Sequence, residues 1–269
     1  MHISLLTFLG LALLFDVVQL SVTADSLLDT KNKRHDGRIV GGAAVTIDKY
    51  PYIVSLRRNL DHICAGSVIS SYYAVTCAHC TYSMSSISGV TIHAGSTSRT
   101  TGGKVFNVTA IIRHSEYNPT TFDVDVSVVR VNASFTATTG VGIVQLADLD
   151  FGYPAGTIAT VLGWGRTTTG GSLSASLRAV SIPIISNSEC AATWKNNSIT
   201  NTMMCAGAKG RDACTGDSGG PLVVASNNSN TSVLAGMVSW GSASCGSDYP
   251  GVYTRVTAAK IHNFLMPYV

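Results

Sequence analysis

A serine set among glycines is the first feature of this sequence that can carry covalent chemistry. The run RDACTGDSGGP, residues 211–221, surrounds Ser218 with three glycines and places Asp217 directly before it. Glycine permits a positive φ and a close approach of substrate, so the N–H groups of Gly216 and Ser218 can point together at a developing oxyanion. The pattern indicates a nucleophilic serine, and the alternative that it leaves open is a glycine-rich surface turn with a solvated serine.

The same residues also fit the G-x-S-x-G motif of α/β-hydrolases, because Asp248 and His262 follow in the order that those enzymes use. That motif needs a helix directly after the serine. Here Gly219-Gly220-Pro221 interrupts any helix, and no alternating βαβ pattern surrounds it. We therefore expect a different serine chemistry.

A histidine between two cysteines is the second candidate. Cys77-Ala78-His79-Cys80 has the C-x-x-C spacing of zinc sites and of thiol–disulfide centres. A zinc site would need a second ligand pair at similar spacing, and the other cysteines do not supply one: Cys64, Cys190, Cys205, Cys214 and Cys245. We expect no metal here and no cofactor.

The start of the chain indicates export. Residues 1–24 combine an apolar stretch, broken only by Asp16, with small residues at Val22 and Ala24, which is typical of a secretory signal peptide. The predicted location is extracellular, where thiols pair into disulfides. Seven cysteines leave at least one unpaired.

Composition and periodicity set the class of the scaffold. The chain has 269 residues, a net charge of +3 and 12% charged residues, which is too weak and scattered to indicate nucleic acid or an anionic membrane as a partner. Short β-type runs separated by turn residues predict an all-β fold, an antiparallel sandwich or a pair of barrels, with a helix only at 257–266. Residues 133–142 would join two halves. The predicted strands are 52–56, 67–71, 73–77, 90–95, 126–131, 157–165, 177–185, 221–225, 234–240 and 251–256.

Several motifs in order resemble the trypsin-like serine proteases of the chymotrypsin family, most closely in microbial, fungal or invertebrate style. The matching stretches are RIVGG at 38–42, CAGSVISSYYAVTCAHC at 64–80, DVSVV at 125–129, GWG at 163–165, DACTGDSGGP at 212–221, SWG at 239–241 and YPGVYTRV at 249–256. The resemblance implies two six-stranded antiparallel Greek-key β-barrels with the active site between them and a C-terminal helix. It assigns residues 39–145 to the first barrel and 146–269 to the second, together one peptidase domain.

The resemblance implies a catalytic triad of Ser218, His79 and Asp125, with the N–H groups of Gly216 and Ser218 as the oxyanion hole. The other histidines after Arg38 look like surface or core-edge residues: His62, His93, His114 and His262. The stretch TFDVDVSVV offers two aspartates on one face of an extended strand. The family favours Asp125, with His79 and the Ser239 hydroxyl as its donors, and leaves Asp123 solvated.

Substrate choice is implied by Asp212, which resembles the base of the primary pocket in trypsins. Gly241 and Gly251 match small wall positions, and the other pocket residues by resemblance are Ala213, Ser239 and Trp240. Expected partners are proteins and peptides with Arg or Lys before the scissile bond, and protein protease inhibitors. Ala213 stands where many trypsins have Ser, so we expect a preference for Arg, whose guanidinium reaches a carboxylate bidentately. Trp194 would pack behind the pocket.

The resemblance also implies activation of a precursor. Residues 25–38 would be an activation peptide, and cleavage after Arg38 would free an ammonium on Ile39 that pairs with Asp217. An Arg-specific product could cut its own precursor. The alternative function is a non-catalytic protease homologue that serves as a binding or regulatory module.

The remaining expectations concern the cysteines and surface. By resemblance the disulfides are Cys64–Cys80, Cys190–Cys205 and Cys214–Cys245, which leaves Cys77 as a small buried residue; the alternative is an intermolecular bridge or a reactive thiol. Calcium is not expected, because the loop at 94–104 carries no acidic residue. We expect a monomer. N-glycosylation sequons stand at Asn107, Asn132, Asn196, Asn227 and Asn230.

Overall fold

A computed structural model describes residues 41–195, 199–226 and 231–269 of the chain. The predicted signal peptide, the activation peptide with Arg38 and Ile39, and three of the five sequons lie outside these residues. No helix in the described ranges is long and apolar enough to cross a membrane.

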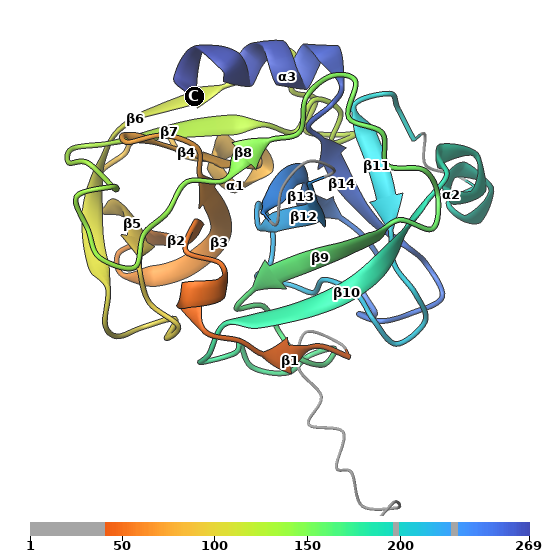
Figure 1. The fold of residues 1–269 in the computed structure, drawn as a ribbon, viewed down its shortest axis with the longest axis horizontal. Coiled ribbons are helices and arrows are strands. Elements are labelled where there is room, and N and C mark those ends of the chain that lie inside the picture. Colours follow the sequence, from red (N-terminus) through yellow and green to blue (C-terminus); the bar gives the residue numbers. More distant parts are fainter. Residues whose placement is uncertain (1–40, 196–198, 227–230) are drawn as a thin grey trace, which may run out of the picture. The chain divides into compact units, whose positions relative to one another are not determined.

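Six antiparallel strands close the first barrel, on the left in Figure 1. Their order around the barrel is β2-β3-β4-β7-β6-β5. The strands are β2 (Ile53–Arg58), β3 (Asp61–Val68), β4 (Tyr73–Thr76), β5 (Val90–Ala94), β6 (Lys104–Arg113) and β7 (Ser127–Val131). Closure leaves no free sheet edge in this half.

A second set of six antiparallel strands also closes, in the order β9-β10-β11-β14-β13-β12, because β9 pairs with both β10 and β12. The strands are β9 (Ile158–Gly163), β10 (Arg178–Ile185), β11 (Met203–Ala206), β12 (Pro221–Ala225), β13 (Ser232–Trp240) and β14 (Gly251–Arg255). Two short strands add to this barrel: β1 (Ala43–Ala44) pairs with β10, and β8 (Gln145–Leu146) runs parallel to β13. The expected pair of six-stranded barrels is confirmed.

Within residues 41–195, 199–226 and 231–269 the helices are few and short. They are α1 (His79–Tyr82), α2 (Asn187–Thr193) and α3 (Ala259–Leu265), with 3-10 turns η2 (Ile47–Lys49) and η3 (Met266–Tyr268). The predicted C-terminal helix is α3, and its apolar stripe is buried at Ile261 and Leu265. The helix α2 begins at Ser186, whose side chain accepts a hydrogen bond from the Glu189 N–H as an N-cap.

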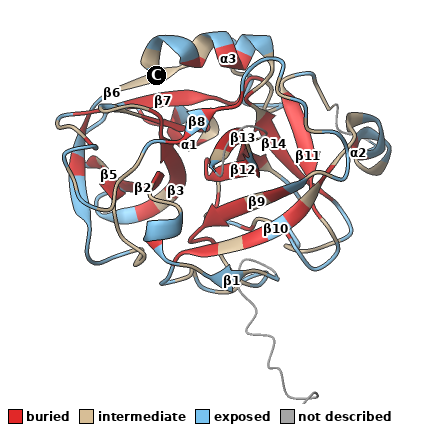
Figure 2. Ribbon diagram, viewed as in Figure 1, coloured by how far each residue is buried: buried red, intermediate tan, exposed pale blue. Residues whose placement is uncertain are grey.

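Apolar side chains fill both barrels, and Figure 2 shows the strands largely buried. In the first barrel the rings of Phe106 and Phe135 pack 4.7 Å apart, and both are almost fully buried. In the second, Val161, Ile182 and Leu222 are completely buried. Removing this apolar surface from water is the main driving force for the fold.

Several elements were not predicted from the residues: the short β1, β8 and α1, most of β3, and β6, β11 and α2. Strand β6 was missed although Phe106 and Val108 are buried between exposed Val105, Asn107 and Thr109, which is the alternation of a half-buried strand. Strand β11 and helix α2 were missed too. The helix has only seven residues, too few for a clear helical period, and its N-cap serine was its main signal.

Candidate active site

Two hydrogen bonds join His79 to the Asp125 carboxylate, one from its ring and one from its backbone. His79 opens helix α1 directly after β4, and its Nδ1 lies 2.7 Å from Asp125 Oδ2. The backbone N–H of His79 donates to Asp125 Oδ1 over 2.8 Å. A carboxylate can only accept, so Nδ1 carries the proton. The ring is thereby held with Nε2 free to take up a proton.

Asp125 also accepts from the second barrel. The Ser239 hydroxyl on β13 donates to Asp125 Oδ2 over 2.6 Å, and the Thr254 hydroxyl on β14 donates to the Asp125 carbonyl over 2.7 Å. Asp125 is only 2% exposed, so these donors replace the water that it has lost. The sequence-based expectation that His79 and Ser239 supply donors to Asp125 agrees with these contacts.

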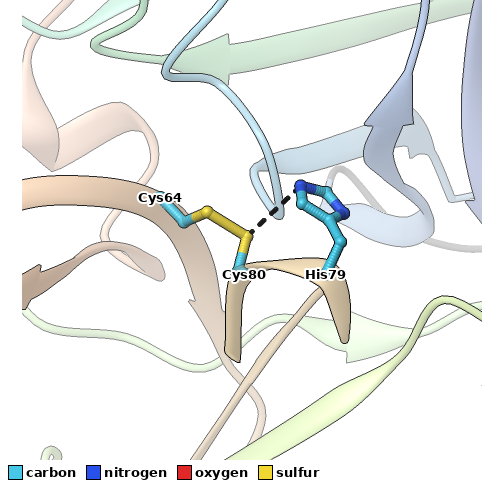
Figure 3. A group of neighbouring side chains, drawn as sticks. All are labelled: Cys64, His79 and Cys80. Carbon is cyan, nitrogen blue, oxygen red and sulfur yellow. Dashed lines mark hydrogen bonds between the residues drawn. A yellow bond between two sulfur atoms is a disulfide. The ribbon is translucent and has the colours of Figure 1, made fainter. Parts of the chain in front are cut away.

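The other edge of the His79 ring faces a disulfide. Figure 3 shows Nε2 pointing toward Cys80 Sγ, which is 3.6 Å away and bonded to Cys64. The Phe122 ring packs against the imidazole with 5.5 Å between ring centroids. Among the described residues Ser218 Oγ makes no hydrogen bond to His79. Such contacts often tighten only when substrate binds.

The segment 214–220, which we call the serine loop, depends on glycine at two positions. Gly216 and Gly219 have φ values of +98° and +74°, a region that favours glycine. A Cβ on Gly219 would lie 2.1 Å from Thr76 Oγ1 and 2.5 Å from the Ala65 carbonyl. The loop therefore lies directly against β4 and β3, and the Ala65 N–H donates to the Ser218 carbonyl over 2.8 Å.

Three N–H groups of the serine loop, those of Thr215, Gly216 and Ser218, have no acceptor among the described residues. Within the described residues, neither Gly216 nor Ser218 donates its N–H to a backbone carbonyl, whereas Asp217, Gly219 and Gly220 all do. Free N–H groups two residues apart are what an oxyanion hole requires.

His62 holds the serine loop from the first barrel, which the sequence analysis did not anticipate. Its Nε2 donates to the Gly216 carbonyl over 2.8 Å, while its Nδ1 accepts from the Ser55 hydroxyl over 2.8 Å. Burial is the main cause that lowers the pKa of His62 to about 4, and the positive charges of Arg99 and Arg57 lower it further. The hydrogen bond to Gly216 acts in the opposite direction but does not outweigh them, so the ring is neutral near pH 7. The sequence predicts a surface or core-edge residue at this position and no strand there, so no local pattern indicates the contact of His62 with Gly216.

Asp217 is a completely buried carboxylate. Its oxygens accept from the N–H groups of Gly165, over 2.7 Å, and Cys214, over 2.9 Å. A Cβ on Gly165 would lie 2.4 Å from this carboxyl group, which accounts for the second glycine of the GWG motif. Burial raises the pKa of Asp217 to about 6 although both N–H donors oppose the shift. No cation among the described residues pairs with it.

A cavity of about 260 Å³ is lined by both Ser218 and Asp212. Ala213, Ser239, Trp240, Gly241 and Gly251 line it as well. Asp212 is 4% exposed, and its Oδ1 has no hydrogen-bond partner among the described residues. Burial raises the pKa of Asp212 to about 7, with backbone N–H groups of Ala213 and Gly246 opposing the shift. A buried carboxyl oxygen without a partner can accept a hydrogen bond from a group that enters the cavity.

Glycine keeps the cavity open. A Cβ on Gly251 would lie 2.8 Å from Asp212 Oδ1, and the nearest atom to a Cβ on Gly241 would be the Gly251 Cα at 3.7 Å. Trp194 packs behind the wall, with its ring 4.9 Å from that of Trp240 and its Nε1 donating to the Pro250 carbonyl over 3.0 Å.

The cysteines form the three expected disulfides, Cys64–Cys80, Cys190–Cys205 and Cys214–Cys245. Cys77 is free, completely buried, and donates to the Val238 carbonyl over 3.2 Å. The position of Cys77 agrees with the expected small buried residue, because a completely buried thiol has no access to a second chain.

Two clusters in the described ranges bring three metal-ligand side chains together, and both contain His79. In one, the sulfurs of Cys64 and Cys80 are tied in their disulfide (Figure 3). In the other, burial raises the pKa of the Cys77 thiol and His79 Nδ1 already bonds to Asp125. Neither cluster offers zinc a thiolate set.

The residues of the alternative hydrolase motif are not brought to Ser218. Asp248 is an exposed residue that pairs with Lys209 over 3.2 Å, and His262 lies on α3 beside another cavity. Asp123 is the one site expectation that the structure corrects. Asp123 is half-buried rather than solvated. Its carboxylate accepts hydrogen bonds from the hydroxyls of Thr200 and Thr202, which lie in the segment that leads into β11.

Comparison with known proteins identifies the family. The trypsin family's sequence profile matches residues 39–262. The chain is 42% identical over 229 residues to trypsin alpha of Drosophila erecta, covering 84% of this chain and 86% of that protein. It is 42% identical to trypsin delta of Drosophila melanogaster, with 84% and 87% covered, and 41% identical to trypsin alpha-4 of Lucilia cuprina, with 84% and 86% covered. The chain therefore belongs to the trypsin family of serine proteases, and its relatives include the invertebrate trypsins that its motifs resemble.

Proposed function

We propose that this chain is a secreted serine endopeptidase that is made as a zymogen and hydrolyses peptide bonds after Arg and Lys. The observation that carries the proposal is the cavity lined by both Ser218 and Asp212, where one buried carboxyl oxygen of Asp212 has no hydrogen-bond partner among the described residues. Such a cavity fits a long cationic side chain and presents the bond that follows it to the serine.

The proposed chemistry is acyl transfer through Ser218, His79 and Asp125. Ser218 Oγ attacks the scissile carbonyl while His79 Nε2 takes its proton and returns it to the leaving amine. Asp125 holds the proton on Nδ1, 2.7 Å away, and stabilises the imidazolium. The N–H groups of Gly216 and Ser218 bind the oxyanion, and water then attacks the acyl-enzyme with the same base.

Specificity in this proposal comes from the base of the cavity. Asp212 pairs with the substrate's cation, which favours the ionised carboxyl group. Ala213 offers no hydroxyl for a Lys ammonium, whereas an Arg guanidinium can bond both oxygens of Asp212 directly. We therefore propose that the enzyme prefers Arg over Lys.

Activation is proposed to proceed by cleavage after Arg38. The new ammonium of Ile39 would pair with Asp217, the buried carboxylate that has only N–H donors among the described residues. This pairing would order the serine loop and the cavity. Because the site ends in Arg, the mature enzyme could cleave its own precursor.

Secretion is supported by the three disulfides and by the insect trypsins among the relatives. Expected partners are protein substrates and protein protease inhibitors, with the enzyme acting as a monomer. Asn107 and Asn132 are exposed and adjacent, and the Asn107 N–H donates to Asn132 Oδ1 over 3.0 Å. They are the two proposed glycosylation sites within the described residues.

The test is N-terminal sequencing of the secreted protein together with hydrolysis of matched Arg, Lys and Phe chromogenic peptides, for wild type and Ser218→Ala. We expect wild type to begin at Ile39 and cleave after Arg and Lys, and the variant to cleave nothing. A wild-type chain that begins at Ile39 and cleaves none of the peptides would favour the non-catalytic binding module instead.

A further inference from the structure

The residues directly before Asp125 form a turn that is tied to the other barrel. Asp123 Oδ1 accepts from the Thr200 hydroxyl over 2.7 Å, from the Thr202 hydroxyl, and from the Val124 N–H over 3.0 Å. The two hydroxyls are 2.9 Å apart and belong to the segment that leads into β11. A single carboxyl oxygen thus gathers three donors, two of them from a distant part of the chain.

The ionised form of Asp123 suits these contacts. Burial acts to raise the pKa of Asp123, but hydrogen bonds from Thr202, Thr200 and Val124 outweigh it, and the pKa lies below the usual value. The carboxylate is therefore charged near neutral pH, and charge-assisted hydrogen bonds are stronger than neutral ones.

The backbone around Asp123 needs support. Phe122 and Val124 have φ values of +57° and +55°, a region that non-glycine residues rarely adopt and that is a clear outlier for a β-branched valine. Strained residues persist where the surrounding structure holds them. Here the Asp123 contacts, and the bonds from the Asn118 N–H to the Asp123 carbonyl and from the Phe122 N–H to the Asn118 carbonyl, provide that support.

Both ends of this turn contact His79. The Phe122 ring packs on the imidazole with centroids 5.5 Å apart, and Asp125, next after Val124, bonds to both the ring and the backbone N–H of His79. A shift of the turn would therefore move both groups that hold the ring in place. A misplacement of about 1 Å can lower a rate by about 100-fold.

We propose that Asp123 is a positioning residue, whose carboxylate, held by Thr200 and Thr202, fixes the turn that places Phe122 and Asp125 against His79. The proposal rests on the proposed protease function. It adds a contact between barrels that acts on the geometry of His79 without touching substrate.

The test compares Asp123→Ala with Asp123→Asn, which keeps the accepting oxygen, and with the exposed Asp148→Ala as a matched control. We expect Asp123→Ala to lower kcat for an Arg peptide about tenfold with KM within about twofold, because the cavity of Asp212 is not touched. Asp123→Asn should restore most of kcat, and Asp148→Ala should behave as wild type.

A second readout separates positioning from stability. In the inactive Ser218→Ala background, the NMR signal of the His79 Nδ1 proton should shift or broaden with Asp123→Ala, and a purely structural role would lower Tm without moving it. If Asp123→Ala does not fold, the Thr200→Val/Thr202→Val variant takes its place with the same expected changes. Wild-type kcat together with an unchanged His79 signal would overturn the proposal. Failure of the wild type to cleave would instead contradict the protease function, and the His79 signal would still decide the role of Asp123.

Discussion

At the scale of single residues, the sequence predicts a chemical role wherever a motif restricts the residue type at a position. His79, Asp125, Asp212 and Ser218 were identified from motifs, and the structure brings the first two into direct contact and puts the other two in one cavity. The contacts of His62 and Asp123 were not predicted. Each is made to a segment far away in the sequence, Gly216 and Thr200 respectively, and no local pattern encodes such a pairing.

The small residue beside Asp212 carries a prediction at this scale. The Ala213→Ser variant adds a hydroxyl that can accept from a Lys ammonium, and such a hydrogen bond is worth about 1 kcal/mol, or about fivefold. We expect kcat/KM for Lys peptides to rise by about this factor while the value for matched Arg peptides changes little. Equal kcat/KM for Arg and Lys in the wild type would contradict the proposed Arg preference.

At the scale of elements, strands with short continuous valine runs were predicted, whereas β6 was missed although half of its ten residues are β-branched. The runs of β7 and β12 are rich in valine and end in polar or turn residues, so they are clear from sequence. The serine loop has no regular structure, and its path depends on contact with β3 and β4. Its glycines predict an unusual backbone conformation, but only the structure shows that Thr76 and the Ala65 carbonyl leave no room for a side chain at Gly219.

The contact of the serine loop with β4 predicts the effect of a single methyl group. Gly219→Ala places a Cβ 2.1 Å from Thr76 Oγ1 at a φ of +74°, so the loop must shift. We expect a loss of about 1–3 kcal/mol in unfolding free energy, measured in urea, and a fall in kcat. The matched control is Gly152→Ala, where nothing lies within 4 Å, and equal effects of the two substitutions would refute this account of the loop.

At the scale of the whole molecule, the family motifs predict the pair of barrels. The pattern of short β-type runs alone is equally consistent with a β-sandwich. Closure depends on which strands pair, and the decisive pairing of β9 with both β10 and β12 joins segments far apart in the chain. The two barrels are bridged at the site itself, since Asp125 accepts from Ser239 and the serine loop accepts from His62. The polar contacts that join the barrels therefore also position the residues of the candidate active site.

Two buried carboxyl groups predict how the stability of the precursor depends on pH. The pKa values of Asp217 and Asp212 are raised to about 6 and about 7, from the usual 3.8. Between pH 3.8 and these values the two carboxyl groups hold more protons in the folded state than in the unfolded state, so their contribution to the unfolding free energy falls as pH rises. His62, with its pKa lowered to about 4, contributes a rise over the same range. Urea unfolding of the uncleaved Ser218→Ala chain measures the sum, and a carboxyl variant isolates the decline.

The matched variant is Asp217→Asn in the same inactive background. It should flatten the part of the decline that ends near pH 6, because the group that releases its proton there is gone. An identical pH slope with and without Asp217 would show that this carboxyl group does not carry the effect.

The most direct test of the central claim is a burst titration of the protein that begins at Ile39, using 4-nitrophenyl 4-guanidinobenzoate, whose cation fits the cavity of Asp212 and whose ester acylates a serine. The account predicts one equivalent of nitrophenol per chain, a matching acyl mass on the peptide that contains Ser218, and no burst from Ser218→Ala. Absence of a burst from a folded wild-type chain with Ile39 at its N-terminus would contradict it.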